Sequence, residues 1–263
     1  MRIFYTIYLV VYKIRIIFVP WNYKSIEMSN NVYTYKYPHP AVATDSVVFG
    51  YDGKNLHVLL IERGIEPFKG SWALPGGFLK MNETVEEWAR RELEEETNIK
   101  DIYLEQFHVF SAVDRDPRER ILSVSFLALV RKSDYNVIAG DDAAKTEWFD
   151  IDKLPDLAFD HKEIIDMAIE KLQQILRYKP IAFKLLDKKF IMSELQKLYE
   201  IINGTEYDRR NFQKKMIATG LLNEEGLCDI PMQCRAPQMF SFNEEKFNEL
   251  IENKENRKYP FDF

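Results

Sequence analysis

Runs of apolar residues mark several extended segments in the first half of the chain. Most of these runs are rich in β-branched side chains, which favour strands. Asp52-Gly53 lies between the first two runs and predicts a hairpin turn, while the proline and glycines of residues 63–71 predict a loop. The predicted strands cover residues 41–50, 56–61, 102–113 and 121–131.

A helical pattern follows the Gly76-Gly77 turn. Apolar residues recur there at steps of four, which gives the segment one face to pack against a core. Thr84, with Glu87 three residues later, forms a capping box that predicts the helix start, and Asn98 tolerates the left-handed conformation at its end. The apolar face consists of Val85, Ala89 and Leu93, with Trp88 beside them.

A second long apolar stripe at helical spacing begins after Asp160 and ends near Arg177. Tyr178-Lys179-Pro180 then predicts a short linker, because proline disfavours a helical conformation in the residue before it. The chain is therefore divided into an N-terminal extension over residues 1–35, a first domain over 36–177 and a second domain over 181–255.

Two short helices joined by a tight turn are predicted in the second domain. The first covers residues 193–202 and stops at Gly204, and the second covers residues 209–217 and is capped by Asp208. This arrangement is typical of a helix-turn-helix, and residues 221–242 suit a β-hairpin wing. The basic second helix is a candidate DNA-contacting element, with a solvated surface helix as the alternative. Its candidate DNA-binding residues are Arg209, Arg210, Asn211, Gln213, Lys214 and Lys215.

The composition is that of a soluble globular protein, with 46% apolar and 30% charged residues. The net charge of 36 − 42 = −6 excludes a generally basic chain, although residues 177–220 carry ten Lys or Arg against five Asp or Glu. Cys228 and Cys234 lack the further ligands of a zinc site and are interpreted as reduced thiols of a cytoplasmic protein.

Residues 1–27 are apolar and aromatic, but Lys13 and Arg15 interrupt the run well before the roughly 20 residues that a membrane span needs. No small-residue cleavage site follows, as a signal peptide would require. We interpret this stretch as a mis-assigned initiation region before Met28, with an interfacial segment as the alternative. No membrane partner is predicted.

Three carboxylates share one face of the first predicted helix. Glu92, Glu95 and Glu96 stand at positions i, i+3 and i+4, where like charges repel by about a few tenths of a kcal/mol per pair. A hard cation between them would relieve this repulsion, because Mg²⁺ prefers oxygen ligands. A solvated acidic face is the alternative. The register of the surrounding residues favours the metal site.

That register resembles the Nudix box. Gly77 is followed by five residues and Glu83, then by seven residues and the run Arg91-Glu92-Leu93-Glu94-Glu95-Glu96-Thr97-Asn98-Ile99. The motif has glycine where this chain has Asn98, a change that concerns a helix cap rather than a carboxylate. The resemblance implies an α+β fold, a Nudix α/β/α sandwich with a mixed sheet. It also implies hydrolysis of a nucleoside diphosphate linked to another group, with Mg²⁺ or Mn²⁺ as cofactor.

The same resemblance assigns roles within the box. Glu147 is a candidate general base outside the box, with an ordinary surface strand residue as the alternative. Arg91 is expected to orient a carboxylate, and Glu83 to support Arg91 or the loop. The predicted metal ligands and catalytic residues are Glu92, Glu95 and Glu96, with Arg91 and Glu83 in these supporting catalytic roles.

Residues 114–120 carry three arginines between two predicted strands. Beside a site for an anion, arginines bind phosphates by bidentate hydrogen bonds, and a solvated charge cluster is the alternative. Together with residues 139–143 and 157–161, the segment resembles the ADP-ribose-type branch of Nudix proteins. Phe68 and Trp72 are suited either to stacking on a base or to filling the core. The candidate substrate-binding residues are Arg63, Trp72, Gly76, Gly77, Arg115 and Arg118.

The second domain resembles the winged-helix module of the NrtR-type Nudix transcriptional regulators. The resemblance implies a homodimer that binds a double-stranded DNA operator and responds to ADP-ribose or a related nucleoside diphosphate sugar. A hydrolase with a regulatory function, a repressor that only senses the ligand, and a second domain used only for dimerisation are the alternatives. The matching residues are Phe190, Glu194-Leu195-Gln196, Tyr199-Glu200, Gly204 and Arg210-Asn211-Phe212.

Overall fold

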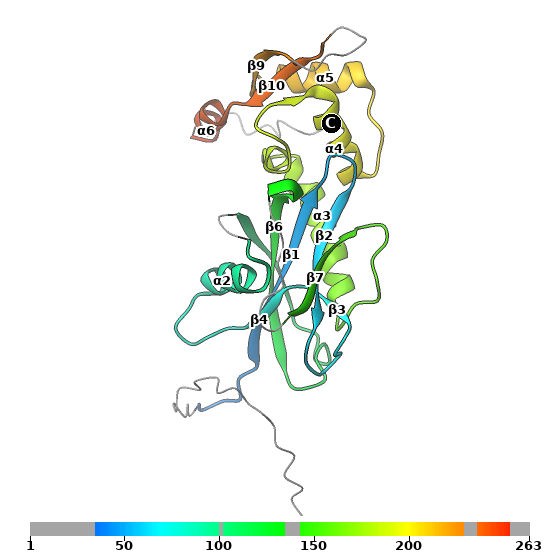
Figure 1. Cartoon of the computed structure of the whole chain (residues 1–263). Helices are drawn as coiled ribbons and strands as arrows, with labels where there is room; N and C mark the ends of the chain where they lie inside the picture. The colour runs from blue at the N-terminus through cyan, green and yellow to red at the C-terminus, as the bar shows by residue number, and fades with distance from the viewer. Residues whose placement is uncertain (1–34, 100–101, 135–142, 229–235, 253–263) are drawn as a thin grey trace, which may run out of the picture. The chain divides into compact units, whose positions relative to one another are not determined.

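The computed structural model describes residues 35–99, 102–134, 143–228 and 236–252 of the 263-residue chain (Figure 1). The chain divides into two compact units, residues 1–39 and 40–263, and each is considered by itself. The interpretation of residues 1–27 and of Met28 concerns a segment outside the described residues. In the described ranges, no helix is long and apolar enough to cross a membrane.

Seven strands of the described chain form one mixed sheet. Its main order is β3-β2-β1-β6-β5, with β4 paired to β1 and β7 paired to β2. β1 and β6 run parallel, with Ala41 opposite Ile121 and Tyr51 opposite Arg131, whereas the other pairs are antiparallel. The strands are β1 (Ala41–Tyr51), β2 (Leu56–Arg63), β3 (Trp72–Ala73), β4 (Gly76–Phe78), β5 (Tyr103–Phe110), β6 (Ile121–Arg131) and β7 (Ala143–Asp150).

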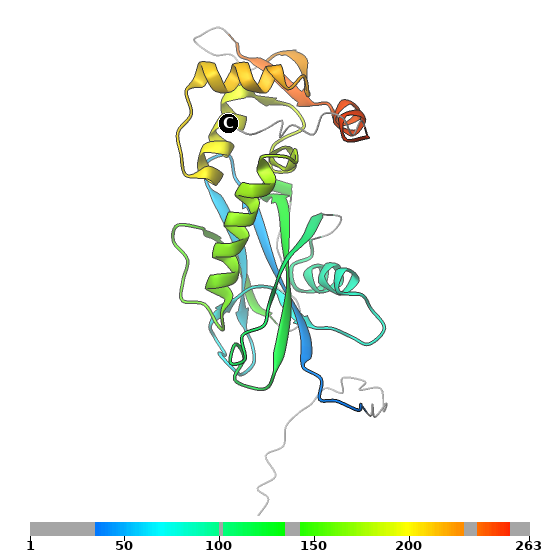
Figure 2. The same cartoon turned by 180° about the vertical axis from the view of Figure 1, so that it is seen from behind.

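Two helices cover opposite faces of this sheet. Val48 of β1 belongs to the same buried cluster as Leu93 of α2 (Val85–Thr97). Its neighbour Phe49 belongs to another cluster, which contains Leu172 of α3 (His161–Leu176). Successive side chains of a strand point to opposite faces, so α2 and α3 lie on different sides. Accordingly, α3 lies behind the sheet in Figure 1 and in front of it in Figure 2. This arrangement confirms the α/β/α sandwich.

The helix that carries the three carboxylates begins and ends where the sequence predicts. Thr84 Oγ1 accepts a hydrogen bond from the Glu87 N–H at 3.2 Å, and Glu87 Oε2 accepts one from the Thr84 N–H at 2.9 Å. Asn98 has a φ of 59° at the other end, and its N–H donates to the Glu94 carbonyl oxygen. These local contacts confirm the capping box and the left-handed cap, and they set the register of the acidic face.

A winged helix follows α3. Gly204 ends α4 with a φ of 62°, and Asp208 caps α5 by accepting a hydrogen bond from the Asn211 N–H at 2.8 Å. A small antiparallel sheet in the order β8-β10-β9 contains the predicted wing, of which residues 229–235 lie outside the described residues. The elements are η2 (Ile181–Lys184), β8 (Phe190–Ile191), α4 (Met192–Asn203), α5 (Arg209–Ala218), β9 (Leu222–Leu227), β10 (Gln238–Phe242) and α6 (Glu244–Glu252).

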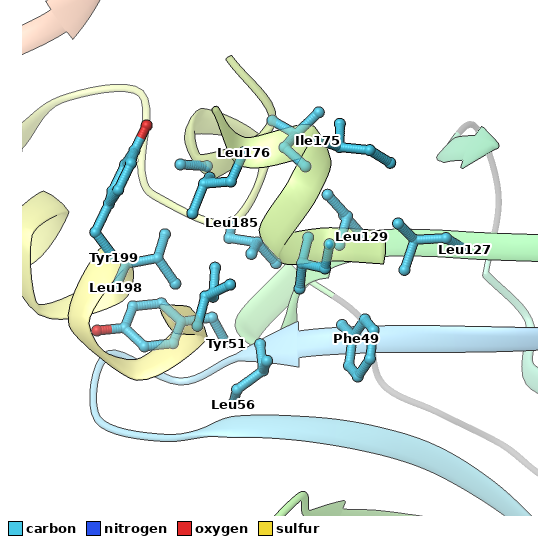
Figure 3. Packing of buried hydrophobic residues seen from close by; sticks show 14 of the residues in the cluster. Phe49, Tyr51, Leu56, Leu127, Leu129, Ile175, Leu176, Leu185, Leu198 and Tyr199 are labelled. Atoms are coloured by element: carbon cyan, nitrogen blue, oxygen red, sulfur yellow. The ribbon is translucent and has the colours of Figure 1, made fainter. Parts of the chain in front are cut away.

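One buried apolar cluster includes residues of the large sheet and of the winged helix (Figure 3). It contains Phe49 of β1, Ile175 of α3, Leu185 after η2 and Leu198 of α4. The predicted linker over residues 178–180 therefore connects two regions that share a core. The predicted domain boundaries themselves stay predictions.

Candidate functional site

The carboxylates of α2 lie against the glycines of β4. Glu96 is buried, with 7% of its surface exposed, and its Oε2 accepts a hydrogen bond from the Gly76 N–H at 2.8 Å. A Cβ on Gly77 would lie 2.2 Å from Glu92 Oε1, and one on Gly76 would lie 2.1 Å from the Thr44 carbonyl oxygen. The two glycines are therefore required for the close approach of β4 to α2 and β1.

Arg91 contacts several carboxylates around α2. Its Nε and Nη2 donate to the two oxygens of Glu83 at 2.9 and 3.2 Å, and its Nη1 donates to Glu95 Oε2 at 2.5 Å. The guanidinium also lies 4.1 Å from the centre of the Trp88 ring, within the range of a cation–π contact. The hydrogen bond to Glu83 raises the pKa of Arg91, so this side chain stays a cation that orients its carboxylate partners.

The oxygen atoms beside β4 are the ligand type that a hard divalent cation requires. Glu92 and Glu96 lie one helical turn apart, and both contact the glycines of β4. Glu95, with 58% of its side chain exposed, is held by Arg91 instead. Across the described ranges, no three His, Cys, Asp or Glu side chains are grouped closely enough to hold a metal ion. Glu92 and Glu96 thus fit a divalent cation, and Glu95 would join them only after leaving Arg91.

Arg115, a predicted phosphate ligand, lies in a buried ion-pair network. Its Nη2 donates to Asp45 Oδ2 at 3.1 Å and to Asp160 Oδ1 at 2.7 Å, and its Nε donates to Asp160 Oδ2 at 2.8 Å. Only 4% of the Arg115 side chain is exposed, and Ser123 Oγ donates a further hydrogen bond to Asp45. This position differs from the expectation, because the guanidinium holds β1 and the start of α3 together instead of facing an open phosphate site.

His161 completes this buried network. Its Nδ1 accepts a hydrogen bond from the Leu74 N–H at 2.8 Å, and its Nε2 lies 3.5 Å from Asp45 Oδ1. Burial lowers the pKa of His161, which keeps the ring neutral and able to accept at Nδ1. Asp45 and His161 were not among the predicted site residues. A charged residue inside a predicted strand was the signal for Asp45.

The other predicted substrate ligands occupy different surroundings. The Cζ atoms of Arg63 and Arg118 lie 4.9 and 5.7 Å from the centre of the Phe159 ring, so the structure brings these three side chains together. Trp72 packs its ring 4.7 Å from that of Phe149, at the edge of the main core. Trp72 therefore contributes to apolar packing, whereas Arg63, Arg118 and Phe159 form a cationic and aromatic surface.

Glu147, the candidate general base, lies on β7 opposite Leu60 of β2. Its side chain is 44% exposed and forms an ion pair with Lys145. This environment is that of a surface strand residue, and the catalytic role of Glu147 stays a prediction.

The second candidate site is the exposed side of α5. Phe212 and Met216 are buried, with 1% and 0% of their surface exposed, and they attach the helix to the core. The Asp208 cap places Arg209 and Arg210 in the first turn of the helix, and Lys215 lies in its last turn. All of the predicted DNA-binding residues are exposed: Arg209, Arg210, Asn211, Gln213, Lys214 and Lys215.

Two known domain families match successive parts of the chain. The NUDIX domain family matches residues 39–168, and the NrtR DNA-binding winged helix domain family matches residues 182–242. The "ADPR responsive transcriptional repressor NtrR" of Acinetobacter baylyi is 33% identical over 210 residues, which cover 78% of this chain and 83% of that protein. An "ADP-ribose pyrophosphatase" of Methanocaldococcus jannaschii is 46% identical over 129 residues, which cover 49% of this chain and 73% of that protein.

Solved structures show the same two-part architecture. NrtR of Shewanella oneidensis, complexed with a 27mer DNA, is 28% identical with a TM-score of 0.68, covering 79% of this chain and 95% of that one. A MutT/nudix family protein from Enterococcus faecalis is 30% identical with a TM-score of 0.67, covering 80% of this chain and 89% of that one.

The fold and the box residues define a Nudix hydrolase domain joined to a winged-helix DNA-binding domain. The chain belongs to the Nudix family, in the group whose members carry an NrtR-type winged helix.

Proposed function

We propose that the protein is a pyrophosphohydrolase of ADP-ribose, or of a similar nucleoside diphosphate sugar, and that it uses Mg²⁺ or Mn²⁺. Water adds to one phosphorus and the P–O–P bond breaks, which converts ADP-ribose to AMP and ribose 5-phosphate. The observation that carries this proposal is the position of Glu92 and Glu96 against the glycines of β4. The name of the pyrophosphatase relative, which is 46% identical, supports the substrate class.

The residues of the chain have separate tasks in this reaction. Glu92 and Glu96, with Glu95 once it has left Arg91, would hold the divalent cation, and the bound cation would neutralise phosphate charge and polarise oxygen. The Gly76 N–H keeps Glu96 in place, and Arg91 orients Glu83. Arg63 and Arg118 bind the phosphates of the substrate through their guanidinium groups.

The winged helix is proposed to bind an operator in double-stranded DNA as part of a homodimer. The exposed basic side of α5 suits the major groove, where guanidinium, ammonium and amide groups contact phosphates and base edges. The Shewanella oneidensis NrtR structure, which contains a 27mer DNA, supports this proposal. Binding of ADP-ribose to the Nudix domain would release the DNA, and we place this activity in the cytoplasm.

Both parts of the proposal are tested by one titration. Purified protein is mixed with labelled genomic DNA fragments that it selects, and ADP-ribose is added in the presence of Mg²⁺. We expect the mobility shift to disappear while AMP and ribose 5-phosphate accumulate in the same tubes. Glu95→Gln should abolish product formation. Hydrolysis unaffected by Glu95→Gln, or no hydrolysis with either Mg²⁺ or Mn²⁺, would rule out the enzyme.

A repressor that only senses its ligand is the second candidate. The observation that favours it is the ion pair between Glu95 and Arg91, which engages one of the three box carboxylates, while across the described ranges no three such side chains are grouped to hold a metal ion. In that case ADP-ribose would release DNA without being consumed, and Glu95→Gln would leave the release unchanged. A winged helix used only for dimerisation would show dimers in a sizing experiment and no mobility shift.

A further inference from the structure

Two phenylalanines beside the Nudix box have left-handed backbone conformations. Phe68 has a φ of 63° and Phe159 a φ of 53°. Bulky side chains rarely adopt this region, and such residues persist only where the surrounding structure holds them. The two rings meet edge to face, with 4.8 Å between their centres. The chain therefore holds both residues in an unfavourable conformation that brings their rings together.

The ring of Phe159 is contacted by two guanidinium groups. Arg63, at the end of β2, lies 4.9 Å from its centre, and Arg118, between β5 and β6, lies 5.7 Å from it. Arg118 also lies 5.1 Å from the centre of the Phe78 ring. These distances are in the range of cation–π attraction, which offsets part of the repulsion between the two cations. We call Arg63, Phe68, Phe78, Arg118 and Phe159 the aromatic–arginine cluster.

The two cations of this cluster have hydrogen-bonding capacity beyond the contacts they make. Among the described residues, the side chain of Arg63 donates only through Nε, to the Pro67 carbonyl oxygen at 2.8 Å. Arg118 donates to Asp116 through Nε and Nη2, at 2.9 and 2.6 Å. Burial and the nearby charge of Arg118 lower the pKa of Arg63. Bringing an anion between the two side chains would relieve this repulsion.

The aromatic–arginine cluster adjoins the carboxylates of α2. Phe78 directly follows Gly77, where an added Cβ would lie 2.2 Å from Glu92 Oε1. Arg63 is near enough for the charge of Glu96 to favour its protonated form. A ligand with a negatively charged diphosphate would thus meet the guanidinium groups on one side and a cation held by the carboxylates on the other.

We propose that Phe159 is a positioning residue that holds Arg63 and Arg118 together as a two-arginine clamp for the diphosphate of the ligand. The assignment rests on the proposed function. The left-handed conformation of Phe159 is fixed because the next residue, Asp160, is held by two hydrogen bonds from Arg115. Phe68 closes the edge of the same ring, and its exposed surface, 42% of the residue, is available to an aromatic base.

Inorganic pyrophosphate is the probe that tests the clamp without relying on hydrolysis. Its dissociation constant is measured by calorimetry for the full chain, without divalent cation. We expect Phe159→Leu to weaken binding at least tenfold, because leucine fills space without offering a π face. Phe159→Tyr, which keeps the face, should stay within twofold of wild type. Circular dichroism and thermal unfolding of each variant show whether it has folded.

Arg118→Gln and Arg120→Gln are matched variants of one segment. Arg120 donates to the carbonyl oxygens of Ser111 and Ala112, both at 2.8 Å, and takes no part in the cluster. Arg118→Gln should weaken pyrophosphate binding at least tenfold, whereas Arg120→Gln should change it less than twofold. If Phe159→Leu does not fold, the pyrophosphate affinities of Arg118→Gln, Arg120→Gln and Phe159→Tyr are each compared with that of the wild type. These three comparisons still test the clamp.

Steady-state kinetics with ADP-ribose provide a second measurement. A clamp that acts on binding predicts that Phe159→Leu raises KM about tenfold and changes kcat less than threefold. No pyrophosphate binding by the wild type, or equal binding by Arg118→Gln and Arg120→Gln, overturns the clamp. If pyrophosphate binds as expected but ADP-ribose is neither bound nor cleaved, the proposed substrate is wrong while the clamp stands.

Discussion

At the residue scale, the site depends on two adjacent glycines, Gly76 and Gly77. A larger side chain would collide with a different neighbour at each position. A Cβ on Gly77 would meet the end of the Glu92 side chain, which can rotate away. A Cβ on Gly76 would meet the backbone carbonyl oxygen of Thr44, which cannot move without distorting β1. A side chain at Gly77 would therefore disturb a predicted metal ligand, whereas one at Gly76 would disturb the packing of the sheet.

This difference predicts that substitution by alanine lowers activity at Gly77 and lowers stability at Gly76. Gly77→Ala is expected to displace Glu92 and to lower ADP-ribose hydrolysis at least about tenfold with little change in Tm. Gly76→Ala is expected to reduce the free energy of unfolding by about 1–3 kcal/mol, as overpacking does. Initial rates and thermal unfolding of the two variants provide the test. Full activity of Gly77→Ala, or equal loss of stability in both, would contradict it.

His161 gives the stability of the protein a dependence on pH. Its folded-state pKa is lowered by burial from the ordinary value of 6.5, so the unfolded chain binds a proton more readily. The contribution of the neutral ring is therefore complete above pH 6.5 and decreases as the pH falls below it. The charged groups that act on His161 are Asp45, Asp160, Arg115 and Arg63.

We expect the free energy of unfolding in urea to decrease between pH 7.5 and 5.5 in the wild type. His161→Asn keeps an acceptor for the Leu74 N–H but does not titrate, so the decrease should be smaller in this variant. The exposed His108 supplies the control, since His108→Asn should keep the wild-type dependence on pH. A His161→Asn variant with the full decrease would contradict the assignment.

At the scale of elements, one side of α5 packs against the protein core and the other side carries the predicted DNA-binding residues. Phe212 and Met216 are four residues apart and buried, which fixes one side of the helix to the winged-helix core. The basic and amide side chains occupy exposed positions before Phe212 and between Phe212 and Met216. Changes on the exposed side should therefore affect DNA binding without affecting folding.

Arg210→Ala and Lys214→Ala are each expected to weaken operator binding and to reduce its dependence on salt. Every phosphate contact that is lost should lower the slope of log K against log salt by about 1. Fluorescence anisotropy at several salt concentrations measures both effects. Lys162→Ala, on the exposed side of α3, serves as a control because it removes the same charge elsewhere. Equal effects of Lys162→Ala and Lys214→Ala would indicate only general electrostatic attraction.

At the scale of the whole molecule, residues 40–263 form one compact unit. The buried cluster that contains Phe49 and Ile175 continues to Leu185 and Leu198, as Figure 3 shows. Gln173 of α3 adds a hydrogen bond to a carbonyl oxygen of α4 at 2.8 Å. We therefore expect the Nudix region and the winged helix to unfold together.

The shared core predicts the outcome of Leu185→Ala. The variant should lose about 2–5 kcal/mol of stability and still unfold in a single transition. Three of the four tryptophans, Trp72, Trp88 and Trp148, lie in the Nudix region and none lies in the winged helix, so fluorescence follows the Nudix region, while far-UV circular dichroism reports on both. Val113→Ala, at a position 77% exposed, should change stability by less than about 0.5 kcal/mol. Two separate transitions in the wild type would contradict a common core.

Features that depend on neighbouring residues were predictable from the sequence. The Thr84–Glu87 capping box, the left-handed cap at Asn98 and the cap at Asp208 all involve groups within four positions of each other. The box residues follow for the same reason, because the helical period places Glu92 and Glu96 on one face. The sequence by itself therefore determined the starts and ends of α2 and α5 and which side chains share a face of each helix.

Contacts between distant segments were decided only by the tertiary structure. Arg115 meets Asp160 and Asp45 across 45 and 70 positions of sequence, and no periodicity indicates which carboxylates an arginine will reach. The short strands β3 and β4 exist because they pair with β2 and β1, although Gly76-Gly77 predicted a turn and no element was predicted for residues 72–73. Phe159 likewise acquires its two arginine neighbours only when three segments meet beside the carboxylates. Local patterns encode caps and faces, whereas the partners of buried charges depend on the packing of the complete fold.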